Sequence, residues 1–403
     1  MHQGIGRRSR RGRTRPRHLS ASAPRPRVLI VSGSVGAGHD GAAAALASRL
    51  RAGGTDVDIR DYLFAFPAPI RAAMRGSYAV SVNYLPSVFE WLFTTIEHRT
   101  VVHRLSLAFC RLAQRRVQQW VRPGYDAVVS TYPFASQTLG QLRARGQLRC
   151  AVVTFLTDPA AHRLWVHPGV DHHLTVTQAT AEQGERRYGV PMQVGGPLVA
   201  ERFSRQPESP AALRARATIR AELCLGADTP VALILAGSLG LGDVALTVDA
   251  VLAGRWAIPV VVCGHNERLR GQLSQRPGAR ALGWRADMPD LMAAADVLIT
   301  NAGGLSFTEA LVAGLPAVCF APIPGHGRAN AALLDTAGLA PWAHTPTELT
   351  VAMQAATERK VDRATPPPSL VAAFVARLPS GHFHPDRPPR ARWFSRPRRS
   401  VAA

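Results

Sequence analysis

Short apolar runs alternate with amphipathic stretches along the chain, and the first run is Val-Leu-Ile-Val-Ser over 28–32. A glycine-rich turn follows it, and then an Ala-rich stretch over 40–52 that stops at two glycines, as a helix does. Residues 56–60 alternate between charged and branched apolar side chains, which is typical of a strand. The order strand, glycine turn, helix, strand predicts the beginning of a doubly wound parallel sheet.

Two series of strand signals divide the chain into similar halves. They lie at 126–130, 150–156, 173–177 and 192–195, and then at 231–236, 259–263, 279–282, 297–300 and 317–320. The polar, Pro-containing stretch over 203–212 separates them. We therefore predict an α/β protein with two Rossmann-like domains, over 27–203 and 215–345, joined by a linker over 204–214 and facing each other across a cleft. A helical segment is expected over 346–378.

Positive charge is concentrated at the two ends of the chain. Of a net charge of +21, residues 1–27 carry nine Arg and no acid, and residues 381–403 carry six Arg and one Asp. We expect residues 1–26 and 379–403 to be disordered basic tails, since they lack apolar periodicity. Such tails suit an anionic lipid surface and, by charge alone, nucleic acid. Arg almost completely replaces Lys, so part of this signal reflects coding bias.

Residues 64–120 interleave aromatic and apolar side chains with arginines, from Phe64 to Arg116. This pattern suits an amphipathic surface that lies on a membrane, and equally suits ordinary helices whose aromatic side chains form a core. No stretch approaches the length of about 18 apolar residues that a spanning helix needs. The five cysteines are dispersed, which favours reduced, buried thiols in a cytoplasmic protein.

The first glycine loop, over 32–39, ends in His39 and contains Gly36 and Gly38. Glycines permit a sharp turn, and the following helix N-terminus attracts anions. His39 could take a proton from an acceptor hydroxyl, or could only cap the helix. Asp158 follows another strand, where it could orient His39, contact the acceptor, or simply form a turn before Pro159.

The second half contains three further polar turns after strands. Gly237 and Ser238 lie in a loop whose N–H groups could approach a diphosphate. Residues 300–309 run from a strand through two glycines into a helix that carries Glu309, and a carboxylate there suits the two hydroxyl groups of a ribose. Residues 324–330 place polar side chains where a sugar could bind.

Together these motifs resemble the family 28 glycosyltransferases of the GT-B fold, over roughly 28–345. Within that family the diacylglycerol sugar transferases (monogalactosyldiacylglycerol synthases and processive diacylglycerol glucosyltransferases) are most similar. The motifs are Gly36-Ala-Gly-His39, Thr157-Asp158 with His162 and Trp165, Val262-Cys-Gly-His-Asn266, Met288-Pro289, Asn301-Ala-Gly-Gly304, Thr308-Glu309-Ala310 and Pro324-Gly-His326 with Asn330.

The resemblance implies a role for each matching residue. His39 would be the base, with Gly237 and Ser238 beside the diphosphate and Glu309 on the ribose. Trp284 and Met288 would frame the nucleotide base. The phosphate turn would be formed by Gly303, Gly304 and Ser306, and the sugar side by His326, where the family often has Gln, and Asn330.

The expected reaction is an inverting transfer of a hexose from a UDP-sugar to a lipid, most simply diacylglycerol. We expect no cofactor and no essential metal, since the Asp-Val-Asp over 56–58 lies in an early strand. The expected partners are the UDP-sugar, the lipid and an anionic membrane, without specific nucleic acid. The expected location is cytoplasmic, at the inner face of the cell membrane. A polyprenyl-linked acceptor, a nucleotide-sugar epimerase and a non-catalytic nucleotide-sugar or basic nucleic-acid-binding protein remain alternatives.

Overall fold

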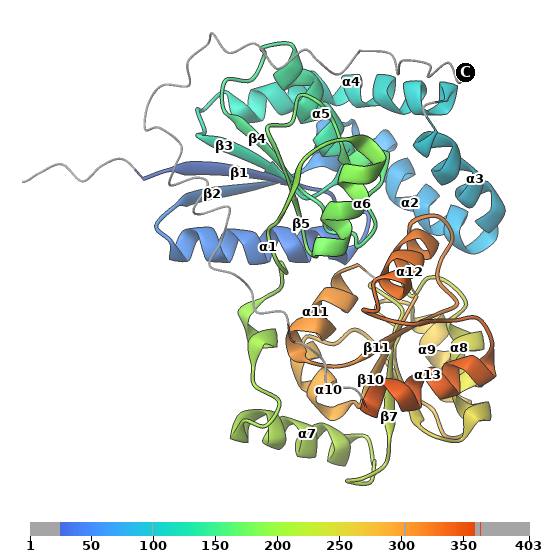
Figure 1. Ribbon diagram of the computed structural model, residues 1–403. Coiled ribbons are helices and arrows are strands. Elements are labelled where there is room, and N and C mark those ends of the chain that lie inside the picture. The colour runs from blue at the N-terminus through green and yellow to red at the C-terminus, as the bar shows by residue number, and fades with distance from the viewer. Residues whose placement is uncertain (1–24, 99, 302–303, 359–362, 364–403) are drawn as a thin grey trace, which may run out of the picture.

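The computed structural model describes residues 25–98, 100–301, 304–358 and 363. Almost all of the two predicted basic tails, and most of the segment expected over 346–378, lie outside the described residues. The described chain forms two α/β domains, each built on a six-stranded parallel sheet (Figure 1). The prediction of two doubly wound parallel sheets is confirmed.

The first sheet has the strand order β2-β1-β3-β4-β5-β6. Its strands are β1 Arg27–Ser32, β2 Asp56–Asp61, β3 Ala127–Ser130, β4 Ala151–Phe155, β5 His172–Thr175 and β6 Met192–Val194. Helix α1 Ala37–Ala52 covers one face, and α4 Val101–Val121 and α5 Pro133–Ala144 contribute to the core on the other. Residues 28–31 of β1 are fully buried, because a central parallel strand is covered on both faces. Helix α6 Gln178–Tyr188 precedes β6.

A helical hairpin interrupts this domain between β2 and α4. It consists of α2 Ala68–Tyr84 and α3 Pro86–Glu97, and a short 3₁₀ turn, η1 Tyr62–Ala65, precedes it. Pro86 is the first residue of α3. It stops α2 from continuing, because proline fits the first turn of a helix but not its interior. The hairpin extends from the first domain toward α12 of the second (Figure 1).

The second sheet has the strand order β12-β11-β10-β7-β8-β9. Its strands are β7 Val231–Leu235, β8 Ile258–Val262, β9 Arg280–Leu282, β10 Val297–Thr300, β11 Ala317–Phe320 and β12 Trp342–Ala343. The helices are α8 Val244–Gly254, α9 Glu267–Ser274, α10 Met288–Ala294, α11 Leu305–Ala313, α12 His326–Thr336 and α13 Pro346–Glu358. They pack two apolar cores against the two sheet faces.

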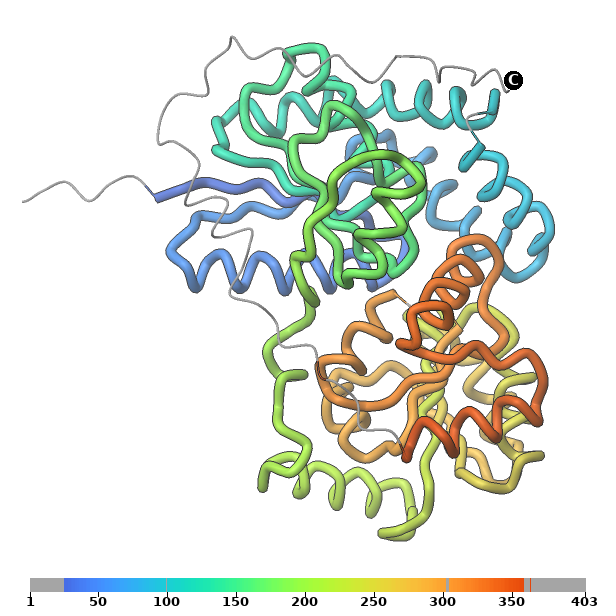
Figure 2. Tube along the Cα trace, in the orientation of Figure 1, coloured from blue at the N-terminus to red at the C-terminus, as the bar shows by residue number. Residues whose placement is uncertain are grey.

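The chain between the domains differs from the expected linker. A 3₁₀ turn, η3 Glu201–Ser204, leads to α7 Pro210–Glu222, so a helix begins inside the stretch interpreted as linker (Figure 2). The Ser209 side chain accepts a hydrogen bond from the Ala212 N–H, and Pro210 occupies the first turn. This Ser-Pro start is a helix signal that the polar composition concealed.

Helix α7 is fixed to the second domain by a buried cation. Arg220 is 4% exposed and donates to Asp296 and to the carbonyl groups of Ala227 and Thr229. Asp296 also accepts from Arg216 and from the Val231 N–H. The buried Arg220 charge is therefore paired, as a buried ion requires.

Four of the five cysteines are buried, whereas Cys224 is exposed. The expectation of buried thiols is thus wrong for Cys224, which lies in the turn after α7 with φ +52°. Among the described helices, none has the length and apolar character needed to cross a bilayer.

Candidate active site

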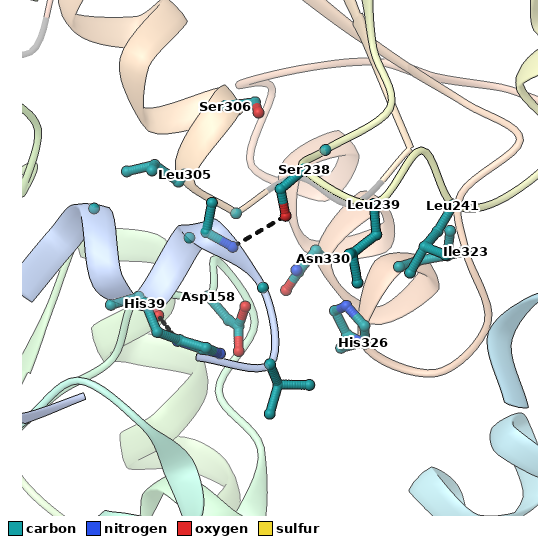
Figure 3. A pocket seen from close by; sticks show the side chains of 18 of the residues that line it. His39, Asp158, Ser238, Leu239, Leu241, Leu305, Ser306, Ile323, His326 and Asn330 are labelled. Carbon is teal, nitrogen blue, oxygen red and sulfur yellow. Dashed lines mark hydrogen bonds between the residues drawn. The ribbon is translucent and has the colours of Figure 1, made fainter. Parts of the chain in front are cut away.

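A cavity of about 640 Å³ lies between the two domains, at the carboxyl ends of both sheets. Figure 3 shows His39 and Asp158 of the first domain facing Ser238, Asn330 and His326 of the second. The structure brings to this cavity every predicted site residue that it describes. They are Gly36, Gly38, His39, Asp158, Gly237, Ser238, Trp284, Met288, Gly304, Ser306, Glu309, His326 and Asn330. Gly303 lies outside the described residues.

His39 occupies the first turn of α1, directly after the glycine loop. Its Nδ1 lies 3.0 Å from the Thr157 hydroxyl, and its ring packs edge-on against Tyr132 at 5.2 Å and near Trp165 at 5.8 Å. Burial lowers the pKa of His39, an effect that the charges of Asp158 and Asp40 partly oppose. The imidazole is therefore mostly neutral at pH 7.

Asp158 does not hydrogen-bond to His39. Its Oδ2 accepts from the Trp165 indole N–H at 3.0 Å, so the carboxylate is fixed on the floor of the cavity. Thr157, one residue earlier, provides the contact that orients His39. Asp158 acts on His39 through charge, by raising its pKa.

The two glycine loops meet across the cavity. The Ser238 hydroxyl accepts from the Ala37 N–H at 3.3 Å, which joins the loop after β7 to the N-terminus of α1. Gly237 and Gly240 have φ +70° and +58°, in the region that favours glycine. A Cβ on Gly240 would approach the Cys263 carbonyl oxygen to 2.8 Å, so the loop packs closely on the next strand connection.

Glu309 lies in α11, one turn beyond the N-cap Gly304. Burial raises the pKa of Glu309 to about 8, and the nearby Arg202 acts in the opposite direction. The Glu309 side chain is half-buried and lines the cavity, where a ligand could supply hydrogen-bond donors to the carboxyl. Trp284 also lines the cavity. Its ring stacks on that of His265 with centroids 4.6 Å apart, and the residue is 53% exposed.

Asn330 and His326 both lie in α12 and face the first domain. The Asn330 Oδ1 accepts from the Ala160 N–H at 2.9 Å, so this predicted sugar-side residue joins the domains. The His326 Nε2 lies 3.3 Å from the Tyr78 hydroxyl of α2. Burial lowers the pKa of His326.

The cavity residues that were missing from the predicted site include Thr157, Arg202 and Tyr78, each of which acts on a predicted residue. Thr157 stands in a motif that the sequence offered, but its contact with His39 depends on the fold. Arg202 lies in η3 beside Glu309, and nothing distinguishes it among the many arginines of the chain. Tyr78 was one of several aromatic residues in the 64–120 stretch. It is distinguished from the others by its contact with His326 of α12, which only the fold reveals.

Groups of three or more His, Cys, Asp or Glu side chains with metal-binding geometry do not occur among the described residues. Asp58, in the Asp-Val-Asp sequence of β2, accepts from the Tyr125 hydroxyl instead. The expectation that no metal is essential remains a prediction.

Two family models match the chain: Monogalactosyldiacylglycerol (MGDG) synthase over 39–193, and Glycosyltransferase family 28 C-terminal domain over 232–358. The processive diacylglycerol beta-glucosyltransferases of Bacillus pumilus (strain SAFR-032) and Bacillus subtilis (strain 168) are 24% and 25% identical to it over 325 residues. In both cases this covers 78% of this chain and 82% of the relative.

Solved glycosyltransferase structures share the architecture. Acinetobacter baumannii MurG has a TM-score of 0.50 at 20% identity, with coverage of 83% of this chain and 93% of that one. The spinosyn rhamnosyltransferase SpnG complexed with thymidine diphosphate has a TM-score of 0.53 at 16% identity, with coverage of 87% and 95%. At such identities the likeness concerns the fold, and it confirms the GT-B prediction.

Proposed function

The chain belongs to the family 28 glycosyltransferases and is a hexosyltransferase, and we propose that it transfers a hexose from a UDP-sugar to diacylglycerol with inversion at the anomeric carbon. The observation that carries this proposal is the arrangement of the cavity. A neutral histidine faces it from the first domain, and two glycine turns and a half-buried carboxyl face it from the second.

The second domain would bind the donor. The loop at Gly237 and Ser238 and the N-terminus of α11 would hold the diphosphate through N–H groups and the helix dipole. Glu309 would accept hydrogen bonds from the ribose hydroxyls. Trp284 and Met288 would frame the uracil, since both line the cavity on that side.

The first domain would supply the base. The acceptor hydroxyl oxygen attacks the anomeric carbon as the bond from that carbon to the diphosphate breaks. His39 Nε2 takes the hydroxyl proton, and UDP leaves with the bonding electron pair. Thr157 holds the ring in place, and Asp158 stabilises the imidazolium that forms.

The wall of the cavity formed by α3 is apolar, as a lipid acceptor requires. Phe89, Leu92, Phe93 and Ile96 line it, whereas Val88 and Trp91 of the same helix are 53% and 59% exposed. One helix thus has one face toward the cavity and another toward the outside. An acyl chain could pass along α3 from a bilayer into the site.

The exposed apolar residues continue over α2 and α4. They are Val80, Tyr84, Leu85, Val88 and Trp91 of the hairpin and Val101, Leu105 and Leu112 of α4, hereafter the interfacial surface. Exposed arginines accompany them on α4, at Arg104, Arg111 and Arg115. Apolar residues beside arginines suit an anionic bilayer, so we propose peripheral attachment to the inner face of the cell membrane.

The decisive experiment is transfer of radiolabelled sugar from UDP-glucose and UDP-galactose to vesicles that contain diacylglycerol, followed by lipid extraction. Label in a glycolipid with one donor supports the proposal and identifies the donor. Label transferred only when a polyprenyl-linked sugar is present would change the acceptor. Interconversion of the two donors without transfer would indicate an epimerase, and tight UDP binding without turnover would indicate a binding protein.

A further inference from the structure

The α2–α3 hairpin of the first domain and the loop before α12 of the second form a second contact between the domains. The Glu90 carboxylate accepts from the Gly325 N–H at 2.7 Å and from Arg328 at 3.2 Å. The Gly242 N–H donates to the Asn83 side chain at 3.2 Å. The first domain therefore contacts the loop that precedes His326.

The contact is close enough to require glycine at position 325. Gly325 has φ +66°, and a Cβ there would lie 3.0 Å from Phe89 and from Phe93. Such a distance is tighter than normal packing, and a side chain would push the hairpin away. The hairpin is thus fitted to this loop.

Tyr78 reaches His326 from this hairpin. The Tyr78 hydroxyl lies 3.3 Å from His326 Nε2, and the rings of Phe89 and Phe93 lie 6.0 and 6.5 Å from the imidazole. Burial raises the pKa of Tyr78 and lowers that of His326, so both groups are neutral near pH 7. The charged or titratable groups that face His326 are Asp158, Glu90 and His39.

We propose that Tyr78 is a positioning residue for the donor sugar, which fixes the ring direction of His326 through its contact with Nε2. A hydrogen bond at Nε2 holds the plane of the imidazole ring, because such a bond weakens steeply when it is bent away from linear. Free rotation would let His326 present either nitrogen to the cavity. Tyr78 thus makes the first domain part of the sugar-binding site.

This inference rests on the proposed function, in which His326 lies on the sugar side of the donor. A sugar hydroxyl can adapt its polarity by rotation, but its hydrogen bond still needs a partner nitrogen that is held at the right distance and angle. UDP lacks the sugar and would not contact His326. The effect of Tyr78 should therefore fall on UDP-sugars and spare UDP.

The test is calorimetric binding of UDP-glucose, UDP-galactose and UDP to the full chain and to Tyr78→Phe. We expect the preferred UDP-sugar to bind roughly fivefold more weakly, which is the effect of about one neutral hydrogen bond, and UDP to bind within twofold of the unchanged chain. Tyr125→Phe is the matched control, because it removes a hydrogen-bonded tyrosine hydroxyl of the first domain that contacts Asp58 and lies outside the cavity. Its binding should not change.

A second comparison uses His326→Ala as the background. There Tyr78→Phe should cause no further loss of UDP-sugar affinity, because its partner is gone. An equal loss of UDP and UDP-sugar binding in Tyr78→Phe, or full additivity with His326→Ala, would overturn the inference. If the unchanged chain bound UDP but no UDP-sugar, the proposed function would fall first, and the inference with it.

Discussion

His39 is held by the contact of its Nδ1 with the Thr157 hydroxyl and by the rings of Tyr132 and Trp165. We predict that His39→Ala lowers kcat by roughly two to four orders of magnitude, because a general base contributes about that factor. UDP affinity should stay within about twofold, since the nucleotide would bind to the other domain. Steady-state transfer assays and calorimetry check both. Near-normal turnover would remove His39 from the mechanism.

The affinity for UDP should depend on pH through Glu309, in a range where ordinary carboxylates are already ionised. Its pKa is raised to about 8 by burial, so in the free protein it is mostly protonated at pH 7. The ribose hydroxyls need the ionised form as acceptor, and binding must therefore release the proton. Affinity for UDP should rise about tenfold between pH 7 and 9 and then level off. The uridine phosphates are already ionised in this range.

Glu309→Gln is the control for this titration, because it keeps the shape and removes the proton equilibrium. Its UDP affinity should be lower than that of the unchanged chain at pH 9 and flat with pH. Calorimetry at pH 7, 8 and 9 in buffers of different ionisation enthalpy would also count the released proton. A pH-independent affinity in the unchanged chain would refute the ribose assignment.

The residue types of the site could be predicted from the sequence, but their contacts could not. The glycines, the histidine and the acidic residues that follow predicted strands were expected to line the cavity. The reason is that the carboxyl ends of parallel strands meet at one edge of a sheet. Whether Thr157 or Asp158 contacts His39 depends on about an ångström of side-chain placement. Arg202 and Tyr78 enter the cavity from η3 and α2, and sequence proximity to a motif does not reveal them.

At the scale of elements, α4 combines an apolar core face with an outer face of Leu and Arg. Its 21 residues contain no Asp or Glu, and Leu105 is 63% exposed. We predict that Leu105→Ser weakens binding to vesicles with anionic lipid about tenfold, because an inserted leucine contributes about 1.5–3 kcal/mol. Sedimentation with vesicles measures this.

Leu213→Ser is the matched control, since Leu213 is 54% exposed but lies on α7. It should leave vesicle binding unchanged. Equal effects of the two substitutions would show that an exposed leucine promotes vesicle binding wherever it lies on the protein surface. No effect of Leu105→Ser would exclude the outer face of α4 from the interfacial surface.

Elements with strong periodicity were predictable, and short or mixed ones were not. Strands such as β7 and β10 are continuous apolar runs covered on both faces, and their bounds differ little from the predicted ones. Strand β12 has two residues, too few for any pattern. Helix α7 was concealed because its outer face is polar and its start lies in a Pro-rich stretch.

At the scale of the whole molecule, the two domains are joined by more than the linker. Ala160 and Ala37 of the first domain donate to Asn330 and Ser238 of the second, and the hairpin contacts the loop at Gly325. The sequence indicated two similar halves and a cleft. It could not show which side chains cross the cleft, because such pairs are about 170 to 240 residues apart.

The charge distribution over the whole chain leads to the last prediction. Residues 1–24 carry seven Arg and residues 381–403 six, with one Asp among them. Near an anionic surface each such charge contributes about 1 kcal/mol, and salt screens the attraction within about 10 Å at 0.1 M. Removing both segments should weaken binding to anionic vesicles and flatten its salt dependence.

The same truncation separates a membrane role from nucleic-acid binding. The truncated chain should bind neutral, diacylglycerol-containing vesicles as before, because that binding depends on the interfacial surface of α2, α3 and α4. UDP binding should also persist. If the truncation changed only binding to DNA or RNA, and left anionic vesicles unaffected, the arginines at the ends would not contribute to membrane attachment. Attachment would then rest on the apolar side chains and arginines of the folded domain alone, and Leu105→Ser would be expected to abolish most of it.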